Sequence, residues 1–263
     1  MISTFTMISA YFAVLMSILV PITITIYGLI KKKLVATPFM IGALMFFVMR
    51  IVIVGAITYG LTLIPVFNDL LNNSLFAAMV VVLILAVVDV LCKYFGYKFL
   101  LKAPDSIRDV MSIALGQGVA EVLMTIAQTA FYCLTIFNAI NNGSIYEAVS
   151  ETLTSADISE LVVQYSAIKP DLLFYYGVSA LCIMALHIIV SFFVVQARNR
   201  RDKRYLLFAF VIILGGLALM YALTIYSYLS ALIAILIYTL VVGYLTYRYK
   251  IYNVQDTADI ISV

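Results

Sequence analysis

Charged residues are scarce in this sequence. Only 11% of its 263 residues are Asp, Glu, Lys or Arg, whereas a soluble domain averages about 25%. Hydrophobic residues make up 65% of the chain, and the net charge is only +3. So small a charge gives no basis for binding nucleic acid, and we expect no nucleic-acid partner. The composition excludes an ordinary soluble domain and favours a chain embedded in a lipid bilayer.

Residue types that bind metals or form disulfides are also few. The chain has one histidine, no tryptophan and three cysteines, Cys92, Cys133 and Cys182, which lie in or beside hydrophobic segments. No CxxC or Cys/His spacing occurs, so neither a zinc finger nor a disulfide framework is indicated. No basic segment precedes the first apolar run, and no clear cleavage site follows it. We therefore expect that run to be retained as a helix.

What the sequence does contain is long apolar runs. Each is close to or above the roughly 20 residues that cross a bilayer as a helix. Seven spans are predicted, at about 4–30, 39–65, 75–100, 110–137, 172–196, 205–223 and 229–247. Short connections and the absence of an obvious linker favour one all-α membrane domain over 1–263, a polytopic helix bundle.

The basic residues predict how this bundle is oriented. They follow the first, third, fifth and seventh spans, whereas the opposite connections carry only Lys169. The positive-inside rule then places the N-terminus outside the cell and the tail 251–263 in the cytoplasm. We expect a multi-pass protein of the cell membrane. Tyrosines near span ends, such as Tyr132 and Tyr228, are predicted to anchor at the membrane interface.

The longest connection, about 138–170, is predicted to be exterior. It carries several acidic residues with spaced apolar ones, which is typical of one or two short amphipathic helices. Two interpretations are open for it. It is either a solvated acidic cap or a lid over the bundle.

A polar stripe interrupts the fourth span. Gln117, Glu121, Thr125, Gln128 and Tyr132 recur at steps of four, four, three and four residues. On a regular helix this spacing places all five on one face. Glycines on both sides of Gln117 predict a close approach by another helix.

Ionisable residues lie at a similar depth in four spans. They are Arg50, Asp89, Lys93, Glu121 and His187, and each isolated charge would cost about 2.5–3.5 kcal/mol at the bilayer centre. Asp89 and Lys93 are four residues apart and can pair locally. Arg50 is then available to Glu121, although pairing with Asp89 is equally open. The cluster is either a functional site or a polar clasp without chemistry.

Four blocks of sequence carry a resemblance to a known family. They are FMIGALMFFVMR at 39–50, DVLCKYFGYKFLLKAPD at 89–105, ALGQGVAEV at 114–122 and ALHIIVSFFVVQAR at 185–198. In order and spacing they resemble the YhfC-type intramembrane proteases, which are distantly similar to CAAX-prenyl-protease-like enzymes. The resemblance covers roughly residues 35–205 and implies a membrane protease fold.

The same resemblance implies roles for individual residues. Glu121 would be the base that activates water, and Gln117 or His187 would donate a hydrogen bond to the developing oxyanion. The family pattern has a histidine where this chain has Gln117, and a second glutamate where it has Val90. Glutamine is a poor zinc ligand, so we predict no metal and no other cofactor.

Three functions follow from these observations. The first is an intramembrane peptidase acting on a membrane-spanning or peptide substrate. The second is a protease-fold protein that has lost catalysis, as Gln117 and Val90 suggest, and that binds a protein partner or acts as a scaffold in the bilayer. The third is a small ion-coupled transporter, for which the sequence shows no internal repeat.

Overall fold

The computed structural model describes residues 1–67, 73–100, 106–149, 154–222, 224 and 226–253. Over these residues the chain is helical and forms no strand. Seven of the helices in this part are long and apolar enough to cross a membrane. The predicted all-α polytopic bundle is therefore confirmed, and the chain is a multi-pass membrane protein.

The first four spans each contain a π-helical turn, labelled η, in which the helix widens by one residue. The first span is α1 (Thr4–Val14), η1 (Leu15–Leu19) and α2 (Val20–Ile30); the second is α3 (Ala36–Phe47), η2 (Val48–Val54) and α4 (Gly55–Thr62); the third is α6 (Ser74–Phe95) and η3 (Gly96–Leu100); the fourth is α7 (Ile107–Val122), η4 (Leu123–Ala127) and α8 (Gln128–Asn142). The last three spans are α11 (Pro170–Asn199), α12 (Arg204–Ala222) and α13 (Tyr228–Arg248).

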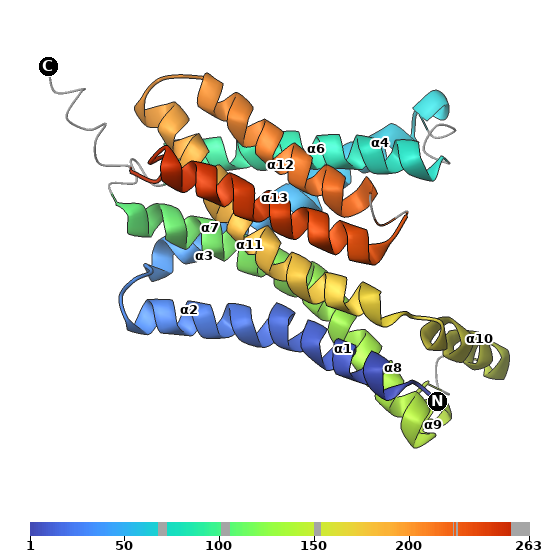
Figure 1. Cartoon of the computed structure of the whole chain (residues 1–263). Helices are drawn as coiled ribbons and strands as arrows, with labels where there is room; N and C mark the ends of the chain where they lie inside the picture. The colour runs from blue at the N-terminus through green and yellow to red at the C-terminus, as the bar shows by residue number, and fades with distance from the viewer. Residues whose placement is uncertain (68–72, 101–105, 150–153, 223, 225, 254–263) are drawn as a thin grey trace, which may run out of the picture.

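Helices α7 and α11 occupy the middle of the bundle (Figure 1). In their apolar windows 61% and 67% of residues are buried, against 22–33% in the other five spans. The outer helices expose large apolar side chains, such as Ile51 and Leu240, which suit contact with lipid. A polar group on α7 or α11 therefore lies in the protein interior rather than in lipid.

Glycines bring α7 against α3 at close range. A Cβ atom at Gly116 would collide with the carbonyl oxygen of Phe39, and one at Gly42 would collide with that of Ile113. On the other side of Gln117, a Cβ at Gly118 would lie 3.0 Å from Cα of Met184 on α11. The predicted close approach at these glycines is therefore confirmed, and it fixes α7 between α3 and α11.

Alanine at Gly42 or Gly116 is expected to lower the free energy of unfolding by about 1–3 kcal/mol, because backbone must move to admit the methyl group. Thermal or denaturant unfolding in detergent measures the change. Gly55 is a matched control in the second span, since no atom outside its own helix lies within 4 Å of a Cβ built there. Equal stability of Gly116→Ala and Gly55→Ala would contradict the proposed packing.

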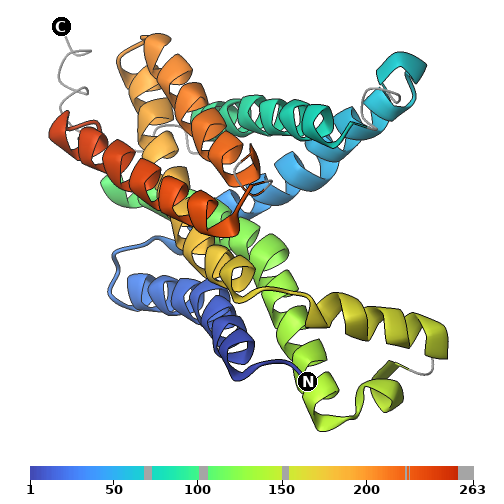
Figure 2. The same ribbon diagram turned by 45° about the vertical axis from the view of Figure 1, so that its right-hand side comes forward.

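The connection after the fourth span contains two short helices, α9 (Ile145–Val149) and α10 (Ser155–Ser166), as predicted. Helix α8 continues to Asn142, five residues beyond the predicted end of the span. Thr154 and Asp157 form a capping box at the start of α10. Figure 2 shows α10 extending away from the bundle, beside the end of α8. This position gives no support to the lid.

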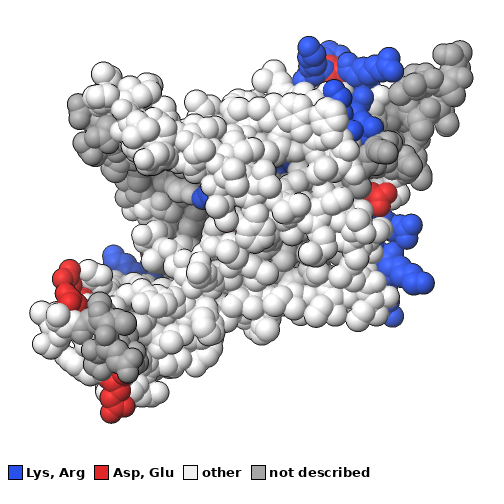
Figure 3. Space-filling model, turned by 180° about the vertical axis from the view of Figure 1, so that it is seen from behind, with Lys and Arg blue, Asp and Glu red and all other residues white. Residues whose placement is uncertain are grey.

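Charge is distributed unevenly along the bundle. Figure 3 shows most of the visible Lys and Arg gathered at one end of the molecule, and most of the visible Asp and Glu at the other. The start of α1 and the end of α13 lie at opposite ends of the bundle (Figure 1). Most of the predicted tail 251–263 lies outside the described residues, although Gln196 Nε2 donates to the carbonyl oxygens of Ile251 and Asn253. An outside N-terminus stays a prediction.

Candidate functional site

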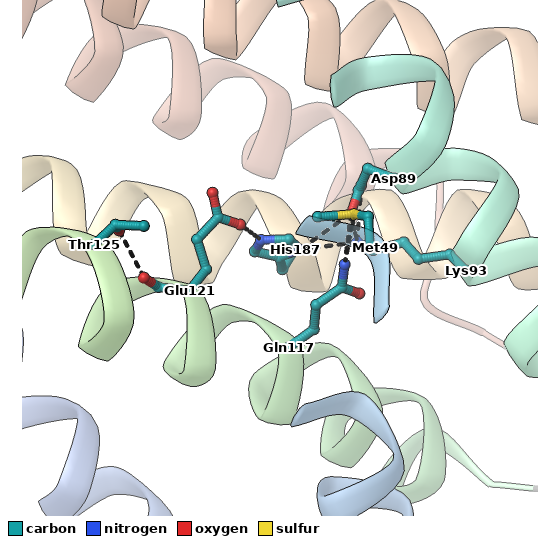
Figure 4. A network of polar contacts seen from close by, with 7 residues as sticks. All are labelled: Met49, Asp89, Lys93, Gln117, Glu121, Thr125 and His187. Atoms are coloured by element: carbon teal, nitrogen blue, oxygen red, sulfur yellow. Dashed lines mark hydrogen bonds and ion pairs between the residues drawn. The ribbon is translucent and has the colours of Figure 1, made fainter. Parts of the chain in front are cut away.

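Five of the six predicted site residues meet between α6, α7 and α11 (Figure 4). Asp89 and Lys93 come from α6, Gln117 and Glu121 from α7, and His187 from α11. They form one continuous chain of contacts, because each of the three helices presents its polar residues toward the other two. The structure thus brings together residues separated by up to 98 positions in the sequence.

Lys93 is the centre of this chain of contacts. Its Nζ lies 2.6 Å from Oδ1 and 2.8 Å from Oδ2 of Asp89. A third contact of 2.8 Å joins Nζ to Nδ1 of His187. Both ionised side chains are buried, with exposed fractions of 0% for Lys93 and 4% for Asp89. The local pairing of Asp89 with Lys93 predicted from their spacing is present.

These contacts define the hydrogen-bonding state of His187. An ammonium group only donates, so Nδ1 of His187 accepts from Lys93. The ring proton of a neutral imidazole then lies on Nε2, which is 2.7 Å from Oε2 of Glu121 and donates to it. The other carboxylate oxygen of Glu121 has no hydrogen-bond partner within the described part of the chain and points away from His187 (Figure 4).

Gln117 turns away from Glu121. Its amide Nε2 donates to Oδ1 of Asp89 at 2.6 Å and also lies 3.6 Å from Sδ of Met49. Its Oε1 is buried and has no partner among the residues described. The amide therefore supports Asp89, and in this arrangement it is already committed rather than free to meet an oxyanion.

The polar stripe of the fourth span does not stay on one face. Gln117 is buried and Glu121 is partly buried, whereas Gln128 and Tyr132 are exposed. The π-helical turn η4 follows Glu121 and shifts the register of the residues beyond it. The prediction of a single face is therefore wrong beyond this turn. The hydroxyl group of Thr125 donates a hydrogen bond of 2.6 Å to the backbone carbonyl oxygen of Glu121.

Arg50 lies apart from the contact chain. It belongs to the π-helical turn η2 and forms no hydrogen bond or ion pair with any described residue. Neither predicted partner, Glu121 or Asp89, lies within ion-pair distance of the guanidinium, although the charge of Arg50 interacts with that of Glu121 across the cavity that both line. Asp89 instead forms an ion pair with Lys93, and Glu121 contacts His187. A guanidinium at membrane depth that lines a cavity beside Glu121 is a candidate functional group.

Two cavities meet at Glu121 and Arg50. The smaller, of about 20 Å³, is also lined by Asp89 and His187, and its size suffices for one water molecule. The larger, of about 330 Å³, extends from Glu121 toward the ends of α11 and α13 at which those helices begin. Half of its lining residues carry an aromatic ring or a hydroxyl group: Thr125, Tyr175, Tyr176, Ser179, Tyr221, Thr224 and Tyr228.

Sequence reasoning missed most of this wall. Tyr228 was predicted to be an interfacial anchor, yet it lines the larger cavity. No pattern in the sequence marks Tyr175 or Tyr176 as part of a site. The only available signal was a Tyr pair one to two turns into the fifth span, which equally suits an anchor. No residue of α9 or α10 lines either cavity in the described regions.

The donor set of the site does not suit a metal ion. The described residues contain no group of three or more His, Cys, Asp and Glu placed to hold one. His187 uses Nδ1 as an acceptor for Lys93 and Nε2 as a donor to Glu121, so neither nitrogen offers a free lone pair. Gln117 is a weak ligand for transition metals.

Comparison with known proteins bears on most of the chain. A family model described as YhfC intramembrane metalloprotease matches residues 16–242. No curated protein and no solved structure gives a significant match. The matched region includes the seven spans in whole or in large part, both cavities and all six predicted site residues. The chain therefore belongs to the YhfC intramembrane metalloprotease family.

Proposed function

We propose that this protein hydrolyses peptide bonds within the cell membrane, with Glu121 as the base that activates water. The observation that carries the proposal is the position of its carboxylate. One oxygen is held by His187 at 2.7 Å, and the side chain borders both a water-sized cavity and a larger one. A general base must reach both a water molecule and the substrate, and this position serves both.

The reaction follows from the residues around the cavity. The unpaired oxygen of Glu121 takes a proton from water as the water oxygen bonds to the peptide carbonyl carbon. The guanidinium of Arg50, on the same cavity wall, stabilises the oxyanion. Glu121 then returns the proton to the nitrogen of the breaking C–N bond, which leaves an amine and a carboxylic acid. His187 keeps the carboxylate oriented throughout.

The family description implies a metal ion, and the residues present do not fit one. In a metallopeptidase the metal polarises the carbonyl and lowers the pKa of a bound water. In this chain His187 has no free lone pair, and the Lys93 ammonium occupies the acceptors of Asp89. The proposed steps use the side chains of this protein alone.

Cleavage of a membrane peptide by the purified protein in liposomes tests the proposal. Hydrolysis in ¹⁸O-labelled water should place the label in the new carboxyl group, and Glu121→Gln should form that product roughly 10²–10⁴-fold more slowly. Glu147→Gln, which changes an exposed glutamate of α9, is the control. Equal cleavage by Glu121→Gln and the wild type would refute the proposed role of Glu121.

Arg50→Gln is expected to lower kcat roughly 10²–10³-fold, as loss of one oxyanion donor does elsewhere. The free energy of unfolding should fall less than in Asp89→Asn, because the guanidinium forms no hydrogen bond or close ion pair with a described residue and acts on Glu121 only across the cavity. Arg50→Lys should restore part of the rate, since it keeps the charge and not the planar donor geometry. Steady-state cleavage and thermal unfolding measure the two effects, with Arg248→Gln as the control. A large loss of stability would instead assign Arg50 a structural role.

A second candidate function is binding without catalysis. It is favoured by the hydrogen bonds of Gln117 with Asp89 and of Lys93 with Asp89 and His187. These side chains contact one another and are therefore not free to contact a substrate. In this case a helix or peptide occupies the larger cavity and is not cut. Association with a co-purifying polypeptide should then survive Glu121→Gln. Ion-coupled transport stays a third prediction, and pH-dependent solute flux in liposomes that requires Glu121 and Asp89 would support it.

A further inference from the structure

The Lys93 ammonium is fully coordinated in the protein interior. Its three N–H donors meet three acceptors, Oδ1 and Oδ2 of Asp89 and Nδ1 of His187, at 2.6, 2.8 and 2.8 Å. No part of the side chain is exposed. Such a lysine contributes neither to solubility nor to attraction toward lipid headgroups, because its ammonium group contacts neither water nor the membrane surface.

The three acceptors are of the kinds that bind zinc. A carboxylate that presents both oxygens and an imidazole nitrogen are ordinary ligands of catalytic zinc sites. In this chain both groups are directed at an ammonium, which carries one positive charge where zinc carries two. A metal ion and Lys93 would need the same lone pair of His187 Nδ1, and only one of them can have it.

The charges of the site agree with this arrangement. Asp89 and Glu121 contribute two negative charges, and their neighbours Lys93 and Arg50 contribute two positive ones, so the charges of the site balance. Zinc added beside Lys93 would leave two uncompensated positive charges in a region of low dielectric constant, which is costly. Balanced charge thus favours the lysine alone.

We propose that the ammonium of Lys93 is the resident cation of this site and takes the place of a divalent metal. Lys93 holds Asp89 and His187 in position and thereby orients His187 toward Glu121. It acts as a positioning residue. The proposal concerns which cation the site contains, and it holds whether or not the protein cleaves peptides.

Metal analysis of the purified full-length protein tests this directly. Protein made in zinc-supplemented medium should contain far less than one zinc ion per chain by mass spectrometry. Its melting temperature should not change when zinc or a chelator is added, because a ligand that does not bind the native state does not stabilise it. Zinc at about one ion per chain, lost in His187→Ala, would overturn the proposal.

A designed variant tests whether Lys93 is what excludes the metal. Lys93→Met combined with Gln117→His removes the ammonium and adds an imidazole beside Asp89. It is expected to bind about one zinc ion per chain and to melt at a higher temperature with zinc. Lys98→Met, which changes an exposed lysine on the next turn, should behave as the wild type. A folded double variant that ignores zinc would contradict the role of Lys93.

The wild-type measurement needs no variant to fold, so the proposal stays testable if Lys93→Met is unstable. Neither readout uses a substrate. Absence of cleavage with no zinc bound would therefore count against the proposed function alone, and cleavage that requires bound zinc would count against the role of Lys93 alone.

Discussion

Replacing Asp89 with asparagine is expected to lower the free energy of unfolding by about 3 kcal/mol, near the lower end of the range for breaking a buried ion pair. Asp89 accepts two contacts from Lys93 and one from Gln117 in a region only 4% exposed. The amide keeps one acceptor oxygen, which limits the loss. The substitution removes the negative charge of Asp89, however, and leaves the ammonium group of Lys93 uncompensated in the bundle interior.

A double-mutant cycle separates this charge effect from a loss of packing. Asp89→Asn with Lys93→Met removes both charges and should recover most of the lost stability, because the penalty comes from the unpaired partner. Asp202→Asn is the control: it breaks a surface pair with Arg204, whose side chain is 83% exposed, and should leave the unfolding transition unchanged. If the double variant is less stable than Asp89→Asn, the buried charge is not the source of the loss.

The fold could be predicted almost fully from the sequence. Apolar runs of sufficient length have few options in a bilayer, since only helices and closed barrels satisfy the backbone there. The predicted spans differ from the observed ones mainly at their ends. The fourth continues to Asn142 because the polar Asn138, Asn141 and Asn142 still permit helix, and the left-handed Gly143 ends it.

The candidate site could be predicted only in part. Their positions along the predicted spans place Asp89, Glu121 and His187 at a similar depth in the membrane. The spacing of four residues predicts the contact between Asp89 and Lys93. The contact of Glu121 with His187 could not be derived, because it depends on how the helices rotate against one another. The glycine contacts of α7 fix that rotation, and their counterparts, Phe39 and Met184, are far away in the sequence.

The π-helical turns also leave no clear mark in the sequence. Turn η2 contains Arg50, and η4 begins two residues after Glu121. Such turns occur often at functional sites, and these two lie beside the same pair of cavities. A helical wheel with a constant 3.6-residue period cannot represent them, so it places Gln128 and Tyr132 on the same face as Gln117 and Glu121.

Replacing Glu121 with glutamine is expected to lower kcat/KM for peptide cleavage by roughly 10²–10⁴-fold, the usual contribution of a general base. The amide matches the carboxylate in size and can still accept from His187, so the fold and substrate binding should persist. Glu121→Asp should give an intermediate loss, because its carboxylate is withdrawn by one methylene from the cavity. Cleavage rates in liposomes, with unfolding curves for each variant, provide the measurement.

His187 supplies the test of mechanism within this series. If it acts by orienting the Glu121 carboxylate, His187→Ala should lower the rate of the wild type strongly and should lower the rate of Glu121→Gln very little. The two losses then fail to add, as they do for residues that work as one unit. Full additivity would mean that His187 acts on the substrate independently of Glu121, and the 2.7 Å contact between them would have no catalytic role.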